Sequence, residues 1–212
     1  MSARRARLSA DRKRVQARVP EHFFKDIFEM DYFAIQVWTG HEDEYVRRLS
    51  ATPCFKDGVL LVPKRSMPLR KRGVLRTIEK PLFSGYVFIP VDGDGLSPEQ
   101  RWSIKTTAYY VRILPDAANP QPIGARDRAV LSHFISFGKS ADTSKVIFDE
   151  HDRIVVLEGP LKGLEGMIVK VDKRKMRAKV RLDLCQDSFR VDLAFEVMER
   201  PAKGSEASNE ST

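Results

Sequence analysis

The segment GPLKGLEGMIVKVDKRKMRAKVRL, residues 159–182, combines three glycines, a dense run of lysine and arginine, and a regular alternation of apolar side chains. Apolar residues occupy every second position over 176–184, with charged residues between them, which is the period of a half-buried strand. Residues 167–171 repeat the pattern, and the polar residues 172–175 separate the two runs as a turn. The expected apolar face comprises Met167, Val169, Val171, Met176, Ala178, Val180, Leu182 and Leu184. The segment therefore predicts a β-hairpin with one apolar face and one basic face.

The residues around this hairpin predict a small β domain. Residues 150–200 contain several short alternating runs and no long helical pattern, which is typical of a small barrel. Gly159, Gly163 and Gly166 are expected at tight turns and at a barrel corner, where a close backbone approach leaves no room for a side chain. Residues 140–149 predict a linker, and residues 201–212 predict a short disordered tail.

Residues 31–139 show a different pattern, in which strands and helices alternate. Two helices are expected to begin at capping boxes, one formed by Thr39 with Glu42 and the other by Ser97 with Gln100. Strands are expected at 32–37, 58–63, 85–91 and 109–114, a basic loop at 64–76, and a third helix around 130–135 that ends at Gly138. This order predicts an α+β domain with an antiparallel sheet.

Residues 1–30 predict a basic, disordered extension. The first twenty residues carry seven arginine or lysine side chains against one aspartate, so the segment repels itself unless it binds an anion. Met30 lies directly before the first expected strand and is a candidate start of the working chain. A nucleic-acid-binding arm and a transit segment are the two alternatives for these residues.

The composition favours a globular protein with a polyanionic partner. The chain has 212 residues, 42% of them apolar, and a net charge of +8 with a pI near 9.6. No apolar run approaches the length of a membrane span, and the arginine-rich start lacks the apolar centre of a secretory signal, so a cytoplasmic protein is expected. Cys54 and Cys185 lie far apart without CxxC spacing and are expected to be reduced.

Three stretches taken together resemble the NusG family of transcription elongation factors. They are YFAIQVWTGHEDEYVRRL, KPLFSGYVFIPVD and RIVVLEGPLKGLEGMIVKVDKRK, and the resemblance covers about residues 31–199. It implies an N-terminal NGN domain over 31–139 and a C-terminal KOW domain over 150–200, which is a small SH3-like barrel. Within the family, the version of the KOW segment found here is most similar to the specialised LoaP-type members, which antiterminate transcription of particular long operons.

The resemblance also implies a docking surface for RNA polymerase. In NusG relatives an apolar patch of the NGN domain binds the clamp of the largest polymerase subunit, and the matching positions here are Tyr32, Phe83 and Tyr86. Large aromatic side chains suit this role because they provide contact area at a low cost in conformational entropy. Ordinary core packing is the alternative, and for Phe83 the two readings are equally supported.

The basic residues predict contact with an RNA leader hairpin or with DNA in the elongation complex, because lysine and arginine pair with phosphates. The candidates are Lys64, Arg65, Arg70, Lys71 and Arg72 in the basic loop, and Lys170, Lys173, Arg174, Lys175, Arg177, Lys179 and Arg181 in the hairpin. A solvated charged surface is the alternative for both groups.

One departure from the family pattern concerns the loop between the last two KOW strands. Housekeeping NusG proteins carry an aromatic residue there, which contacts a ribosomal protein or the Rho terminator, whereas the aligned position here is Cys185. A thiol cannot replace the contact area of an aromatic ring, so ribosome and Rho contacts are in doubt. Phe189 is nearby, but its place before RVDL predicts a strand position.

These patterns favour a monomeric, non-catalytic transcription factor without a cofactor. The histidines are scattered, and no HExxH motif, nucleophile elbow, phosphate-binding glycine loop or metal-spaced acidic cluster is present in the sequence. The expected function is operon-specific processive antitermination. The alternatives are a housekeeping NusG-type factor and a ribosome-associated KOW protein, although the latter leaves the NGN-like half without a role.

Overall fold

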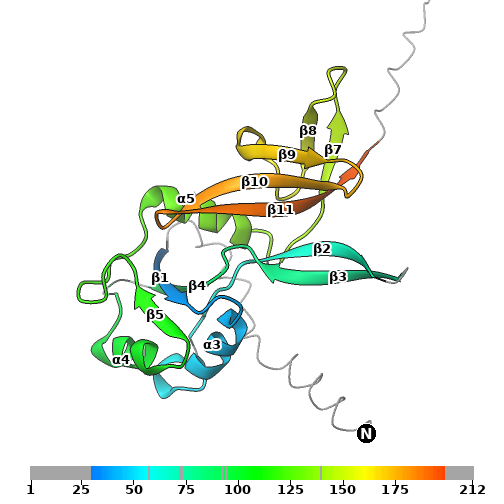
Figure 1. The fold of residues 1–212 in the computed structure, drawn as a ribbon. Helices are drawn as coiled ribbons and strands as arrows, with labels where there is room; N and C mark the ends of the chain where they lie inside the picture. The colour runs from blue at the N-terminus through cyan, green and yellow to red at the C-terminus, as the bar shows by residue number, and fades with distance from the viewer. Residues whose placement is uncertain are drawn as a thin grey trace, which may run out of the picture.

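The computed structural model describes residues 30–198 apart from 57, 72, 73, 92, 94 and 139, and describes only the backbone of 70, 71 and 75. The predicted extension over 1–29 and the predicted tail over 201–212 lie outside the described residues. An N-terminal α+β domain precedes a curled, all-β C-terminal sheet, so the predicted fold class is confirmed (Figure 1).

The N-terminal domain is built on an antiparallel sheet with strand order β4-β1-β5. Its strands are β1 (Asp31–Val37), β4 (Tyr86–Val91) and β5 (Tyr110–Ile113). Phe33 and Ile35 of β1 pack on one face with α3 (Glu42–Leu49) and α4 (Pro98–Thr106), while Tyr32 and Ala34 pack on the other face with α5 (Ala125–Ile135). Since side chains alternate across a strand, β1 contributes to two apolar cores.

Two of the three predicted helix ends are confirmed. The Ser97 hydroxyl accepts a hydrogen bond from the Gln100 amide, and the Gln100 side chain accepts one from the Ser97 amide. Gly138 follows α5 with φ of +83°, and its amide donates to Ile135. The predicted Thr39 capping box is wrong, because the N-cap of α3 is His41, two residues later, and the Glu42 carboxylate accepts hydrogen bonds from the Gly40 and Gly85 amides.

A long hairpin occupies the segment expected to be a basic loop. It consists of β2 (Lys64–Lys71) and β3 (Val74–Pro81), paired in antiparallel register along their full length. The strand expected at 58–63 is replaced by a single bridge between Leu61 and Phe88. Apolar alternation did not identify the hairpin, because most of its described side chains are polar and Met67 is the one fully buried on β2.

The C-terminal sheet has strand order β8-β7-β11-β10-β9. Its strands are β7 (Ser144–Phe148), β8 (Ile154–Glu158), β9 (Ile168–Asp172), β10 (Arg177–Leu184) and β11 (Asp187–Val197). The short strand β6 (Ser140–Ala141) pairs with β2, so the expected linker at 140–149 contains β6 and β7. Two 3₁₀ turns, Pro53–Phe55 and Glu165–Met167, complete the described elements.

The predicted apolar face is confirmed on β10 and only in part before it. Ala178, Val180, Leu182 and Leu184 are buried. The prediction is wrong for Met176, which has φ of +53° in the turn and is 37% exposed. It is also wrong for Met167 and Val169, which are 40% and 54% exposed, whereas Val171 is partly buried and packs against the core. The ladder between β9 and β10 shifts register beside Val180, so the alternation does not continue through β9.

The three glycines of the quoted segment play different roles. Gly159 has φ of +97°, and a Cβ there would lie 2.6 Å from the Cα of Ser144. This position therefore requires glycine both for its left-handed backbone and for its lack of a side chain. Gly163 has φ of +82° but open space around it. Gly166 has neither a positive φ nor a close neighbour, so the expectation of a tight approach is wrong there.

We predict that Gly159→Ala lowers the free energy of unfolding by about 3 kcal/mol or more, because a backbone clash adds to the cost of a left-handed backbone conformation. Gly163→Ala provides the matched control and should lose only about 1 kcal/mol, since it adds the same methyl group without the clash. Urea unfolding of the full chain measures both values. Equal losses would show that the approach to Ser144 does not limit this position.

Candidate functional site

The three predicted polymerase-binding side chains lie together on one face of the N-terminal sheet. Tyr32 belongs to β1, Tyr86 begins β4, and Phe83 lies in the turn between β3 and β4. Their exposed fractions are 0%, 2% and 1%, so none of them reaches the surface. Phe83 also packs edge-on against Phe88 and Phe134, which gives it a role in the core of the domain.

The turn that carries Phe83 and Tyr86 is held by a buried carboxylate. Glu42 Oε1 accepts hydrogen bonds from the amides of Gly85, at 2.6 Å, and Gly40, at 3.0 Å. The Gly85 carbonyl accepts a further bond from the Val37 amide at 2.8 Å. These bonds attach the turn to α3 and β1, so the aromatic side chains are presented from a fixed backbone.

The C-terminal domain covers this aromatic face. The ring of Phe189 on β11 contacts Phe83 and Tyr86 edge-on, with ring centroids 5.4 Å and 5.6 Å apart. The Tyr86 hydroxyl donates to Oδ2 of Asp187 at 2.5 Å. We call this contact between the two domains the domain seam, and Figure 1 shows the β10–β11 turn lying against α5 and the sheet.

Polar contacts extend the domain seam along its length. The Cys185 amide donates to Oδ2 of Asp127 on α5 at 3.0 Å, and His133 Nε2 lies 2.9 Å from the Pro160 carbonyl. At the opposite end of β10, Arg177 Nη2 donates to the Pro68 carbonyl of β2 at 2.8 Å. Arg65 of β2 donates in the other direction, from Nη1 to the Asp192 carbonyl at 2.5 Å. These contacts join α5 and β2 to the C-terminal domain.

Burial at the domain seam changes the acidity of two side chains. It raises the pKa of the Cys185 thiol to about 12, and the neighbouring charges of Asp127 and Asp187 act in the same direction. Burial also raises the pKa of the Tyr86 phenol, as does its hydrogen bond to Asp187. Both groups are therefore held in their neutral forms while the domains are in contact.

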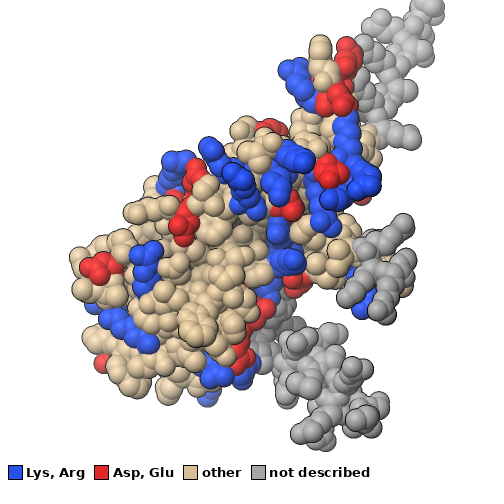
Figure 2. Space-filling model, viewed as in Figure 1, with Lys and Arg blue, Asp and Glu red and all other residues tan. Residues whose placement is uncertain are grey.

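The basic residues of the C-terminal domain gather on the β9–β10 hairpin and its turn. Figure 2 shows lysine and arginine concentrated over this sheet and along the line between it and the β2–β3 hairpin. Several of these side chains have acidic neighbours: Lys173 pairs with Asp152, Lys175 with Asp172 at 3.7 Å, and Lys179 with Asp192 at 3.1 Å. Arg181 and Arg174 are exposed. A nucleic-acid ligand would therefore have to exchange some existing ion pairs.

The five candidate nucleic-acid-binding residues of the predicted basic loop differ in their surroundings. Lys64 pairs with Asp43 at 2.8 Å, next to α3, and Arg65 lies at the domain seam. The side chains of Arg70 and Lys71, and the whole of Arg72, lie outside the described residues. Arg65 therefore lies next to the C-terminal sheet, whereas Lys64 pairs with α3.

Sequence reasoning did not identify the residues that cover the aromatic face. Phe189 was correctly expected on a strand, but nothing in its alternation indicates that it packs against another domain. Asp127, Asp187 and Pro68 gave no signal either, because their partners lie far away in the chain. A bulky aromatic residue on the otherwise polar run DSFR was the one available hint.

Among the described residues, no group of three or more histidine, cysteine, aspartate or glutamate side chains could hold a metal ion. No described helix is long and apolar enough to cross a membrane.

Comparisons with known proteins agree with the two-part architecture. Residues 30–131 match the family model described as transcription termination factor nusG, and residues 152–183 match the KOW motif. The NusG module precedes the KOW motif in this chain, which belongs to the NusG family.

Its relatives include proteins named transcription termination/antitermination protein NusG. The one from Helicobacter pylori strain J99 is 22% identical over 81% of this chain and 98% of its own length. The one from Thermus thermophilus is 27% identical over 65% of this chain and 77% of its own length. A solved structure titled "Domain interaction in Thermotoga maritima NusG" has a TM-score of 0.44 at 16% identity, covering 79% of this chain and 95% of that one.

We predict that Cys185 reacts with iodoacetamide at pH 8 at least about tenfold more slowly than the exposed Cys54, because alkylation requires the thiolate. Its rate should still increase above pH 10, since a pKa near 12 leaves the thiol mostly protonated there. Phe189→Ala should raise the Cys185 rate about tenfold by weakening the domain seam, and Val169→Ala, in an exposed position, should not. Mass spectrometry after timed labelling measures both thiols. Similar rates for the two thiols in the unmodified protein would contradict the closed arrangement.

Proposed function

We propose that the protein is an operon-specific processive antiterminator without catalytic activity, which acts in the cytoplasm. Its N-terminal domain binds the RNA polymerase clamp through the face formed by Tyr32, Phe83 and Tyr86. The observation that carries this proposal is that these three side chains belong to one apolar core on the same side of the sheet. Binding that favours one polymerase conformation increases the population of that conformation, so no chemical step is needed.

The same face is covered in this arrangement, so polymerase binding requires the domains to separate. Phe189 and Asp187 occupy the surface that the polymerase would contact. The proposal therefore includes a closed state, in which the C-terminal domain competes with the polymerase, and an open state that binds it. The affinity for polymerase is then reduced by the fraction of closed molecules.

The C-terminal domain is proposed to select the operon by binding an RNA leader hairpin. Its basic side chains alternate with buried ones on β10, which fixes them about 7 Å apart on the outer face. The turn that includes Cys185 is occupied by the N-terminal domain, and it lacks an aromatic residue at the position used by housekeeping members. Both observations favour a specialised factor over one that contacts the ribosome or Rho through this turn.

In vitro transcription through an intrinsic terminator tests the function directly. An operon-specific antiterminator increases readthrough only when its cognate leader precedes the terminator. A housekeeping factor acts on templates with and without that leader. A ribosome-associated protein binds ribosomes and leaves readthrough unchanged on both templates.

Two substitutions at the domain seam should have opposite effects on binding to core RNA polymerase. Tyr86→Ala should weaken binding about tenfold or more, because it removes a large aromatic side chain from the proposed docking face. Phe189→Ala should strengthen binding several-fold, because it weakens the cover and leaves the docking face intact. Fluorescence anisotropy with labelled protein measures both, and thermal unfolding checks the fold. Phe83 is left unchanged because it also packs against Phe88 and Phe134.

Loss of binding in both variants would contradict the competition between the two domains and the polymerase. Trp102→Ala is a suitable control for this pair, since that aromatic side chain is 69% exposed on α4 and lies outside the proposed face.

Replacing Lys173, Arg174 and Lys175 with alanine should flatten the salt dependence of RNA binding by the full chain. Three lost phosphate contacts correspond to about two units in the slope of log affinity against log salt concentration. Filter binding of a leader hairpin at several salt concentrations measures the slope. Lys162→Ala, on an exposed turn of the same domain, should leave it unchanged. An unchanged slope in the triple variant would make the basic turn a solvated surface.

A further inference from the structure

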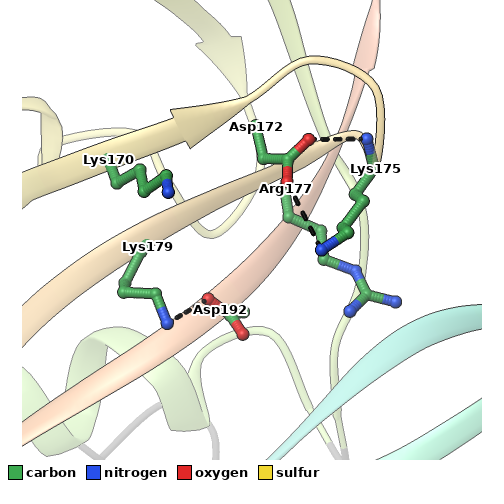
Figure 3. A pocket seen from close by; sticks show the side chains of 6 residues that line it. All are labelled: Lys170, Asp172, Lys175, Arg177, Lys179 and Asp192. Atoms are coloured by element: carbon green, nitrogen blue, oxygen red, sulfur yellow. Dashed lines mark hydrogen bonds and ion pairs between the residues drawn. The ribbon is translucent and has the colours of Figure 1, made fainter.

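A basic pocket lies on the outer face of the β9–β10 hairpin. It is lined by Lys170, Asp172, Lys175, Arg177, Lys179 and Asp192 (Figure 3). Three lysines and Arg177 line it together with two carboxylates, which pair with Lys175 and Lys179. The pocket therefore carries a net positive charge that its own aspartates do not neutralise.

The positive charges of Lys170 and Lys179 repel each other when no anion occupies the pocket. They are direct partners in the antiparallel ladder between β9 and β10, where side chains on one face lie close together. Like charges in such a pair oppose strand pairing, so the arrangement costs stability. Figure 3 shows the Lys179 ammonium directed at Asp192, while no dashed line reaches Lys170, and an anion between the two lysines would relieve their repulsion.

Arg177 lines this pocket but directs its guanidinium away from it. In Figure 3 the guanidinium points away from Lys170, and its Nη2 donates to the Pro68 carbonyl of the N-terminal domain. Its Nε is buried without a hydrogen-bond partner. One side chain thus belongs both to the pocket and to the domain seam, and its hydrogen bonding is incomplete in the closed state.

Arg65, on the N-terminal side of the domain seam, has the same incomplete hydrogen bonding as Arg177. Its Nη1 donates to the Asp192 carbonyl, and its Nε is also buried without a partner. Burial lowers the pKa of Arg65, Asp192 opposes this, and the nearby charge of Arg177 lowers it further. The closed state therefore holds two like charges close together, each with one unused donor.

A phosphate group would compete well for Arg177. A hydrogen bond between guanidinium and phosphate joins two opposite charges, whereas the bond to the Pro68 carbonyl has a neutral acceptor. Rotation of Arg177 toward the pocket would add a donor beside Lys170 and Lys179 and would remove the bond across the domain seam. It would also relieve the repulsion between Arg65 and Arg177.

We infer that the pocket of Lys170, Arg177 and Lys179 binds a backbone phosphate of a nucleic acid, and that this phosphate and the N-terminal domain compete for Arg177. Occupation of the pocket then favours separation of the domains and exposes the aromatic face. By thermodynamic reciprocity, separation of the domains strengthens nucleic-acid binding by the same factor. This inference rests on the proposed RNA contact and adds the coupling between that contact and the docking face.

Cys185 gives the chain its own reporter for this coupling. It lies at the end of β10 opposite Arg177, about 23 Å away for a strand of this length, so a ligand at the pocket does not touch it. Its thiol is partly buried at the domain seam, whereas Cys54 is exposed on the N-terminal domain. A ligand that separates the domains therefore increases alkylation of Cys185 and leaves Cys54 unchanged.

The experiment uses the full chain with an RNA hairpin of about 20 nucleotides, and with a DNA duplex in a second arm. Anisotropy establishes saturation, and timed alkylation gives the rate for each thiol. We expect saturating RNA to increase the Cys185 rate at least threefold at an unchanged Cys54 rate. Arg177→Met should raise the Cys185 rate without ligand and abolish the further increase with RNA, whereas Lys162→Met should behave as the unmodified chain. Phe189→Ala should bind RNA several-fold more tightly, as reciprocity requires.

Two outcomes overturn the inference, and they differ in what else they affect. If RNA binds but the Cys185 rate stays constant or falls, the phosphate does not compete with the N-terminal domain, and the proposed RNA contact stands. A fall would mean that the ligand bridges Arg65 and Arg177 and stabilises the closed state. If neither nucleic acid binds, the proposed RNA contact fails together with the coupling. If DNA but not RNA increases the Cys185 alkylation rate, the pocket still binds a phosphate, and its ligand is DNA.

Discussion

The central sheet of the N-terminal domain has two apolar faces, and covering both of them determines the arrangement of the whole chain. Helices α3 and α4 cover the face that carries Phe33 and Ile35. Helix α5 covers only part of the face that carries Tyr32 and Tyr86, and residues of the C-terminal sheet complete the same core. Because exposed aromatic surface is costly in water, the contact with the C-terminal sheet stabilises this arrangement of the domains.

The β10–β11 hairpin links the two surfaces on which the proposed function depends. Its turn, with Phe189 next to it, contacts the aromatic face, while the opposite end of β10 carries Arg177 and the basic pocket. The two ends differ in physical character, since one depends on burial and the other on charge. Salt weakens contacts of the second kind much more than those of the first, so the two ends respond differently to solution conditions.

Local sequence patterns predicted the elements whose packing follows a simple period. The alternation over 178–184 identified β10 and its buried face correctly, and the Ser97 capping box identified the start of α4. The patterns failed where the stabilising partners lie far away in the chain. Glu42 was expected to cap its own helix, yet its carboxylate holds the turn before β4. The β2–β3 hairpin was missed because its described strands expose mainly polar side chains, so its pairing leaves little apolar alternation in the sequence.

The sequence by itself determined the two-part fold, the basic outer face of β10 and the identity of the aromatic positions. These features follow from side-chain periodicity and from charges that are close in the chain. Only the tertiary structure decided that Phe83 and Tyr86 lie beneath Phe189, and that Arg177 reaches from the pocket to the N-terminal domain. Both arrangements depend on contacts between residues about a hundred positions apart, whose formation depends on how two folded domains fit together and not on any local pattern.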